Sequence, residues 1–141
     1  MVNIRRVVIF TDGASLGNPG PAAIGATIKD EQGRLITTIS QGIGRTTNNQ
    51  AEYRAIIAAL EKAIELGAKQ VDMHSDSELV VRQINGRYRV RNAALKPLYQ
   101  QAKQLISLLK GFTITHIPRQ QNTEADNLAY IALKRPHTTI L

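Results

Sequence analysis

The spacing of apolar residues changes from strand-like to helical near Asn49 in this 141-residue chain, and this change limits the folds open to it. Before that point the segments 7–10, 22–29 and 35–43 are apolar and extended in character, and the second and third flank a hairpin-like DEQGR turn. These segments predict an antiparallel meander of three strands. After that point, apolar residues recur at helical spacing over 53–64.

The second part of the chain alternates strand and helix patterns. The segments 71–74 and 112–117 have the composition of strands, and further helical patterns cover 76–84, 98–109 and 125–133. The resulting order, β-β-β-α-β-α-α-β-α, contains βαβ units, which call for parallel pairing. We therefore expect an α/β fold with one mixed five-stranded sheet, three antiparallel strands plus two parallel ones, flanked by helices.

Length and composition narrow the class of protein. No repeat or long linker interrupts the chain, which predicts a single domain over residues 1–141. There is no cysteine, so disulfides and thiolate metal sites are excluded. No apolar leader and no long apolar run is present, which predicts a cytoplasmic protein without a membrane partner. A net charge of +7 is common among nucleic-acid-binding proteins and is shared by other basic proteins.

Four carboxylates stand at predicted strand ends and helix starts. Asp12 follows the first strand, where a turn aspartate is ordinary. Glu52 lies three residues after Asn49, the spacing of a capping box, and Asp126 has the same spacing from a threonine. Asp76 stands where an N-cap aspartate is common. Taken one at a time, each acid is better explained by such a structural role.

The joint placement of these acids favours a metal site. Two of them end neighbouring strands at the edge where α/β sheets form a crevice, and the other two begin helices beside that edge. Four converging carboxylates would repel one another without a cation, and Mg²⁺ or Mn²⁺ takes oxygen ligands. Two such ions roughly 3.5–4 Å apart suit in-line phosphoryl displacement. Such a site in a basic protein predicts phosphodiester hydrolysis in a polynucleotide.

Four segments point to one family. They read FTDGASLGNPGPAAIG, TTNNQAEYRAIIAAL, SDSELVVRQI and NTEADNLA. In their order and spacing, and over almost its whole length, the chain resembles a compact type 1 ribonuclease H. The resemblance implies the ribonuclease H-like fold and places the family's metal-binding and catalytic acids on Asp12, Glu52, Asp76 and Asp126.

The resemblance also implies an activity. The family's reaction is endonucleolytic cleavage of the RNA strand of RNA/DNA hybrids with two Mg²⁺ (or Mn²⁺) ions, leaving 5′-phosphate and 3′-hydroxyl ends. The partner would be the hybrid itself, and we expect a monomer with no obligate protein partner. Two alternatives stay open, because the same acids could serve another nuclease of this fold or a non-catalytic hybrid-binding module.

These alternatives are less favoured by the sequence. A proofreading-type exonuclease carries Asp-x-Glu in its first strand, whereas Gly13 and Ala14 follow Asp12 here. A binding module, or a domain cut from a polymerase, would not require all four acids. The start methionine and the unbroken chain favour a free-standing enzyme.

The resemblance also implies which residues contact the hybrid. Small residues in the first turn would let backbone N–H groups approach the sugar-phosphate chain, and the asparagines can both donate and accept hydrogen bonds. A threonine before them would hold a phosphate of the DNA strand. The implied residues are Gly13, Ser15 and Asn18 in the first turn, and Thr47, Asn48 and Asn49 before the first long helix. Helix capping is the alternative for the two asparagines, but capping needs only one of them.

Basic residues occur in two connecting segments of the chain. Larger relatives carry a basic protrusion where this chain has only a short connection with Arg87, Arg89 and Arg91, here called the linker arginines. On an extended segment they could face phosphates together, and a solvated basic loop explains them equally well. Many family members also place a histidine in the loop before the last helix. Here that loop contains Arg119, which could contact the scissile phosphate, while His116 falls within a predicted strand, where a histidine is more often structural.

Overall fold

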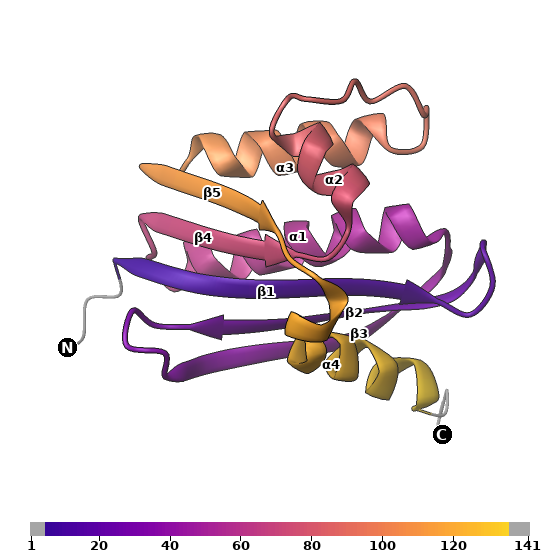
Figure 1. The fold of residues 1–141 in the computed structure, drawn as a ribbon, viewed down its shortest axis with the longest axis horizontal. Helices are drawn as coiled ribbons and strands as arrows, with labels where there is room; N and C mark the ends of the chain where they lie inside the picture. Colours follow the sequence, from indigo (N-terminus) through magenta and orange to yellow (C-terminus); the bar gives the residue numbers. More distant parts are fainter. Residues whose placement is uncertain (1–4, 136–141) are drawn as a thin grey trace.

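Five strands form one mixed sheet in the order β3-β2-β1-β4-β5 (Figure 1). The computed structural model describes residues 5–135. The C-terminal PHTTIL, which the sequence suggests is a partly ordered end, lies outside the described residues. The strands are β1 (Arg6–Ser15), β2 (Gly20–Lys29), β3 (Leu35–Thr46), β4 (Gln70–Ser75) and β5 (Gly111–His116). The helices are α1 (Asn48–Glu65), α2 (Glu78–Ile84), α3 (Lys96–Ser107) and α4 (Thr123–Lys134), with a short 3₁₀ turn at Arg119–Gln121.

The pairing of the strands confirms the mixed sheet expected from the sequence. β1 pairs antiparallel with β2, and β2 pairs antiparallel with β3, which makes the meander. β1 pairs parallel with β4, and β4 pairs parallel with β5, through the helical crossovers. The order of the nine expected elements is therefore confirmed, and the 3₁₀ turn before α4 is an addition to it.

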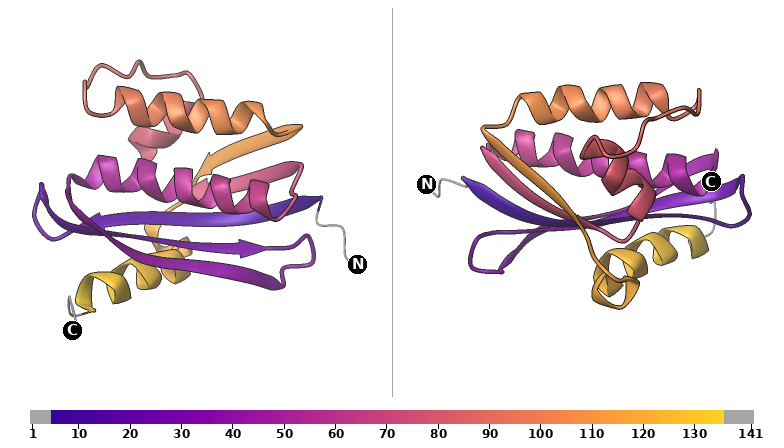
Figure 2. Two further views of the ribbon diagram at one scale, coloured as in Figure 1. Left: turned by 180° about the vertical axis from the view of Figure 1, so that it is seen from behind. Right: turned by 45° about the horizontal axis from the view of Figure 1, so that its top comes forward.

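Helices cover the two faces of the sheet unequally (Figure 2). α1 and α3 lie on one side, and α4 lies on the other, against β1, β2 and β3. The main core lies between the sheet and α1, where alternate residues of β1 and β4 meet the apolar stripe of α1. Its largest fully buried side chains include Tyr53, Ile9, Ile28, Ile56, Leu60 and Met73.

β1 is longer than the sequence predicts. The apolar run ends at Phe10, yet the strand continues to Ser15 because pairing with β2 continues from Asp12↔Gly25 to Ser15↔Ala22. The expectation that Asp12 follows the strand in a turn is therefore wrong. Parallel pairing with β4 ends earlier, at Thr11↔Ser75, so β1 projects beyond its neighbour.

No helix within residues 5–135 combines the length and the apolar character that crossing a lipid bilayer would require.

Candidate active site

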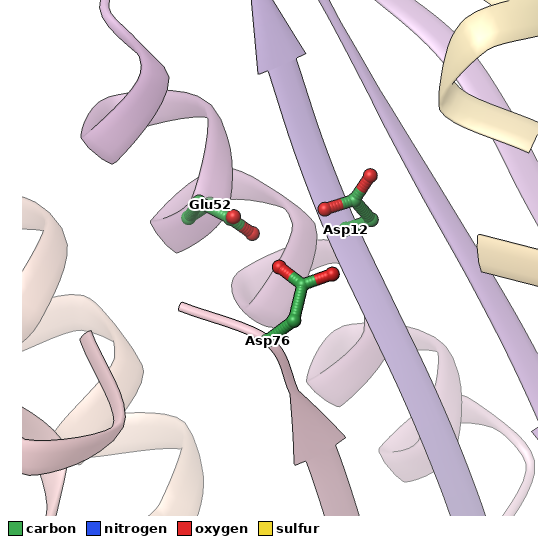
Figure 3. A group of neighbouring side chains, drawn as sticks. All are labelled: Asp12, Glu52 and Asp76. Atoms are coloured by element: carbon green, nitrogen blue, oxygen red, sulfur yellow. The ribbon is translucent and has the colours of Figure 1, made fainter. Parts of the chain in front are cut away.

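Three carboxylates converge where β4 ends beside β1. One oxygen from each of Asp12, Glu52 and Asp76 lies within 4.8 Å of the others (Figure 3). The register Thr11↔Ser75 explains two of them, because Asp12 and Asp76 are the next residues on two parallel neighbours. Their side chains emerge together where the strands separate, and α1 supplies Glu52 from the side. The structure therefore brings together three of the four acids expected from the sequence.

A glycine allows α1 to approach closely enough to place Glu52. A Cβ atom at Gly13 would lie 2.3 Å from the carbonyl carbon of Ala51, so only glycine fits there. The Gly13 N–H donates to Glu52 Oε1 at 3.0 Å, which holds the carboxylate against β1. This contact also replaces the capping box proposed for Glu52. The box that forms at this helix start instead joins Thr47 and Gln50.

The other face of the sheet carries the fourth acid, on α4, which packs closely against β2. Gly25, the partner of Asp12 in β2, has space for no side chain, since a Cβ atom there would lie 2.2 Å from the carbonyl oxygen of Ala125 in α4. Asp126, the next residue, lies outside the 4.8 Å group but near enough to raise the pKa of Asp12. Its side chain is 34% exposed, at the rim of the site.

Helix capping does not account for the other two acids either. The N-cap of α2 is Ser77, whose hydroxyl accepts from the Val80 N–H, so Asp76 is not the cap. The N-cap of α4 is Asn122, and Thr123 is already the first helical residue. The capping roles considered for Asp76 and Asp126 are therefore wrong, and both carboxylates lie toward Asp12 instead.

The electrostatics of the site reflect this crowding. Burial first, then the charges of Asp76 and Asp126, raise the pKa of Asp12 from 3.8 to about 8. Burial likewise raises the pKa of Glu52 well above its ordinary value, and the charges of Asp12 and Asp76 add to the effect. Arg119 opposes both shifts. Crowded, buried carboxylate oxygens are the ligands that Mg²⁺ and Mn²⁺ take, and a divalent cation would offset their repulsion, so the residues fit such an ion.

A polar cluster borders the three acids. Asn48 Oδ1 accepts from the backbone N–H and the hydroxyl of Ser15, at 3.0 and 2.7 Å, and the Asn48 N–H donates to Asn18 Oδ1 at 3.0 Å. A cavity of about 430 Å³ joins this cluster to the acids. It is lined by Asp12, Gly13, Ala14, Ser15, Asn48, Glu52, Asp76 and Arg119. The structure thus gathers Gly13, Ser15, Asn18 and Asn48 around one site.

Thr47 and Asn49, which the resemblance also assigns to the hybrid, lie outside this cluster. The Thr47 hydroxyl accepts from the Gln50 N–H and donates to Gln50 Oε1, so it already serves the cap of α1. Asn49 is exposed and does not line the cavity. Neither asparagine is the N-cap, so the capping alternative considered for Asn48 and Asn49 is wrong.

Basic residues expected to bind the hybrid line two separate cavities. Arg119 lines the cavity of the acids and is 80% exposed, with its Nη2 3.8 Å from Asp126 Oδ1. His116 ends β5 and does not line that cavity. Of the exposed linker arginines, Arg87 and Arg89 line a separate cavity of about 570 Å³ with Lys96 and Tyr99, and Arg91 lies outside it.

Two residues of this region were not anticipated from the sequence. Gly25 sits in an apolar segment, GPAAIGATIK, where nothing marks it as a contact with α4. Asn122 is only 1% exposed and donates to Asp76 Oδ2, yet in the sequence it precedes a helix and looks like an ordinary cap. An unexpectedly buried asparagine cannot be recognised from its neighbours in the chain.

Known proteins resemble this chain in sequence and structure. The model of the family described as "Reverse transcriptase-like" matches residues 10–132. A bifunctional protein of Mycobacterium tuberculosis is 44% identical over 91% of this chain, and Ribonuclease HI of Halobacterium salinarum is 42% identical over 91%. The chain spans 35% of the length of the first and 64% of the second.

Solved structures of similar proteins superimpose on about nine-tenths of this chain. RNase H1 from Halobacterium salinarum superimposes with a TM-score of 0.89 at 42% identity, covering 91% of this chain and 97% of the other. LC11-RNase H1 in complex with an RNA/DNA hybrid gives a TM-score of 0.86 at 41% identity, covering 90% and 96%.

Proposed function

The chain belongs to the type 1 ribonuclease H family, and on that premise we propose that it hydrolyses the RNA strand of RNA/DNA hybrids. The observation that carries the proposal is the convergence of Asp12, Glu52 and Asp76 within 4.8 Å beside a polar cluster. A similar protein, LC11-RNase H1, has been crystallised with such a hybrid, which supports the choice of substrate.

The proposed reaction is internal cleavage by in-line attack of water. The water oxygen forms a bond to phosphorus as the bond from phosphorus to the 3′-oxygen breaks, which leaves a 5′-phosphate and a 3′-hydroxyl. Asp12, Glu52, Asp76 and Asp126 would hold two divalent cations, Mg²⁺ or Mn²⁺, when substrate is bound. Such ions, once bound, activate water and stabilise the charge of the leaving oxygen.

The chain's own residues would arrange the acids for this chemistry. The Gly13 N–H fixes one oxygen of Glu52 and leaves the other free to bind. The charges of Asp76 and Asp126 raise the pKa of Asp12, and the charge of Asp12 raises that of Glu52, so Asp12 would be the acid that the others share in holding the ions. Asp12 and Glu52 are themselves buried, which strengthens the charge interaction between them.

The polar cluster would recognise the RNA sugar. Because Asn48 Oδ1 is already held by Ser15, the NH₂ group of Asn48 is the end that can donate to a 2′-hydroxyl. Gly13, Ser15 and Asn18 would contact the same backbone, and Asn49 would reach the second strand from the exposed start of α1. For Thr47 to bind a DNA phosphate, its hydroxyl proton would turn from Gln50 Oε1 to the phosphate.

The basic residues would bind phosphates. Arg119 shares the cavity of the acids, which supports a contact with the scissile phosphate in place of the family's loop histidine. The linker arginines would contact the DNA strand, and the shared cavity of Arg87 and Arg89 supports this for those two. We further propose a monomer that needs no protein partner. A cytoplasmic location stays a prediction from the sequence.

A cleavage assay tests this function directly. The full chain is incubated with an RNA/DNA hybrid, duplex RNA or duplex DNA, in Mg²⁺ or Mn²⁺, beside Asp12→Asn and the exposed-site control Glu31→Gln. We expect internal cuts in the RNA strand of the hybrid, with ligatable 5′-phosphates, by the parent and Glu31→Gln but not by Asp12→Asn. Binding of the hybrid without cleavage in either metal would favour the non-catalytic module, and equal cleavage by Asp12→Asn would refute the assigned site.

A further inference from the structure

Asn122 is a buried amide beside the acidic site. Its side chain is 1% exposed, and its Nδ2 donates to the carbonyl oxygen of Thr11 at 2.8 Å and to Asp76 Oδ2 at 3.2 Å. Asn122 is also the N-cap residue of α4, but its side chain makes no capping hydrogen bond to that helix. The buried amide therefore serves contacts with β1 and Asp76 rather than the start of its own helix.

Chemistry fixes the orientation of this amide. Both of its partners are hydrogen-bond acceptors, so a flip would set Oδ1 against a carbonyl and a carboxylate oxygen. In the observed orientation Oδ1 is buried without a hydrogen-bond partner in the described part of the chain. A buried acceptor left without a partner is unfavourable. That the Asn122 Oδ1 is left without a partner indicates that the two hydrogen bonds donated by Nδ2 stabilise the amide by more than this cost.

Through these contacts Asn122 connects the elements that carry three of the acids. The carbonyl it binds belongs to Thr11, the residue before Asp12. The carboxylate it binds is Asp76 itself, and its own carbonyl accepts from the Asp126 N–H at 3.1 Å. One residue thus sets the spacing of β1, the β4–α2 junction and the first turn of α4.

We infer that Asn122 is a positioning residue of the acidic site, which holds the Asp76 carboxylate facing Asp12 and Glu52 so that these oxygens can bind a divalent cation (Figure 3). This inference rests on the proposed function. A donor is needed at this position because an amide N–H occupies one oxygen of Asp76 without neutralising its charge. Alanine would remove the donor, and aspartate would add a carboxylate facing Asp76.

The test measures cation binding without substrate. Isothermal calorimetry gives the Mg²⁺ dissociation constant of the parent, of Asn122→Ala and of the control Asn85→Ala, at a pH where the parent binds. Asn85 controls for the loss of one side-chain hydrogen bond away from the site, because its Nδ2 also donates to a backbone carbonyl, that of Ile114, at 3.1 Å, between α2 and β5; unlike Asn122, it is exposed. Thermal unfolding of each variant measures the structural contribution separately.

We expect Asn122→Ala to raise the Mg²⁺ dissociation constant about 10- to 100-fold. The Mg²⁺ concentration needed for half-maximal hybrid cleavage should rise in parallel, while KM for the hybrid at saturating Mg²⁺ changes less than about twofold. Asn85→Ala should lower the unfolding temperature and leave Mg²⁺ binding unchanged. An Asn122→Ala variant that is less stable but binds Mg²⁺ like the parent would overturn the inference.

A measurement on the parent covers the case in which Asn122→Ala does not fold. In ¹⁵N spectra, the side-chain NH₂ signals of Asn122 should shift during a Mg²⁺ titration with the calorimetric dissociation constant, and those of Asn85 should not. Unshifted Asn122 signals at saturation would overturn the inference. A parent that neither binds Mg²⁺ nor cleaves the hybrid would instead refute the proposed function, so the two failures can be told apart.

Discussion

Replacing Asp12 with asparagine should stabilise the cation-free protein, and increasingly so at higher pH. Burial and neighbouring acids raise the pKa of Asp12 from 3.8 to about 8. Below about pH 4 the carboxyl is neutral in both the folded and unfolded chain, and it costs nothing. Between about pH 4 and 8 the unfolded chain releases a proton that the folded protein retains, so stability falls as pH rises. Above about pH 8 the full penalty is present.

The size of the effect follows from the pKa. The rise from 3.8 to about 8 makes ionisation of Asp12 about 6 kcal/mol less favourable in the folded protein, at about 1.4 kcal/mol for each tenfold change. Local rearrangement and water entry reduce such penalties, so we expect Asp12→Asn to add about 2–4 kcal/mol to the free energy of unfolding at pH 9. For a chain of this size, that gain raises the unfolding temperature by about 5–15 °C.

Calorimetric unfolding in EDTA from pH 5 to 9 measures the difference. The gap between Asp12→Asn and the parent should widen with pH, and the exposed-site control Glu31→Gln should follow the parent. Adding Mg²⁺ at pH 8 should stabilise the parent and close most of the gap, since a bound cation offsets the penalty. A parent whose stability is unchanged from pH 5 to 9, or an Asp12→Asn variant less stable than the parent at pH 9, would contradict the reasoning.

Three further changes test other parts of the site. Gly25→Ala should lower the free energy of unfolding by about 2–3 kcal/mol in urea titrations and reduce cleavage, because its methyl group would push α4 away, whereas Gly42→Ala has open space and should do neither. Arg119→Ala removes the cation that lowers the pKa of Asp12 and Glu52, so the acidic limb of the pH–rate profile should move to higher pH. Replacing the linker arginines with alanine should lower hybrid affinity and reduce the slope of log affinity against log salt by up to about 3, with kcat unchanged.

The elements of this fold could be predicted because their signals are local. Apolar spacing located all five strands and four helices, and the βαβ order indicated that two strands join the sheet in parallel. It did not indicate that β4 pairs with β1 rather than with β3, the strand that precedes it in the chain. The end of β1 could not be located this way, because Asp12 to Ser15 are extended through pairing with β2 rather than through their own composition. Thr47 likewise took the cap of α1 in place of Asn49 because Gln50 could close a capping box with it.

The site could be predicted only in part, for the same physical reason. Each of the four acids alone is explained by a turn or a helix cap, and only their joint placement and the family resemblance singled them out. The structure brings three of them within 4.8 Å of one another, namely Asp12, Glu52 and Asp76. The residues that hold them in place could not be singled out in this way, because their contacts join distant parts of the chain. Asn122 binds the carbonyl of Thr11 across 111 residues, and Gly25 meets α4 across about a hundred. Neither residue differs from an ordinary cap or a small strand residue until the fold brings its partner close.

The two glycines explain why repulsion among the acids is not relieved by movement. Gly13 brings α1 against β1 on one face of the sheet, and Gly25 brings α4 against β2 on the other face, each at a distance that excludes even a methyl group. Glu52 belongs to α1 and Asp126 belongs to α4. Separating either carboxylate from Asp12 would therefore require moving a whole packed helix, which close-packed interiors resist. The remaining ways to lower the energy are protonation, which the raised pKa of Asp12 and Glu52 favours, and the binding of a cation. Close packing at two glycines thus keeps the acids crowded, and we expect a divalent ion to relieve the electrostatic repulsion by which this crowding lowers stability.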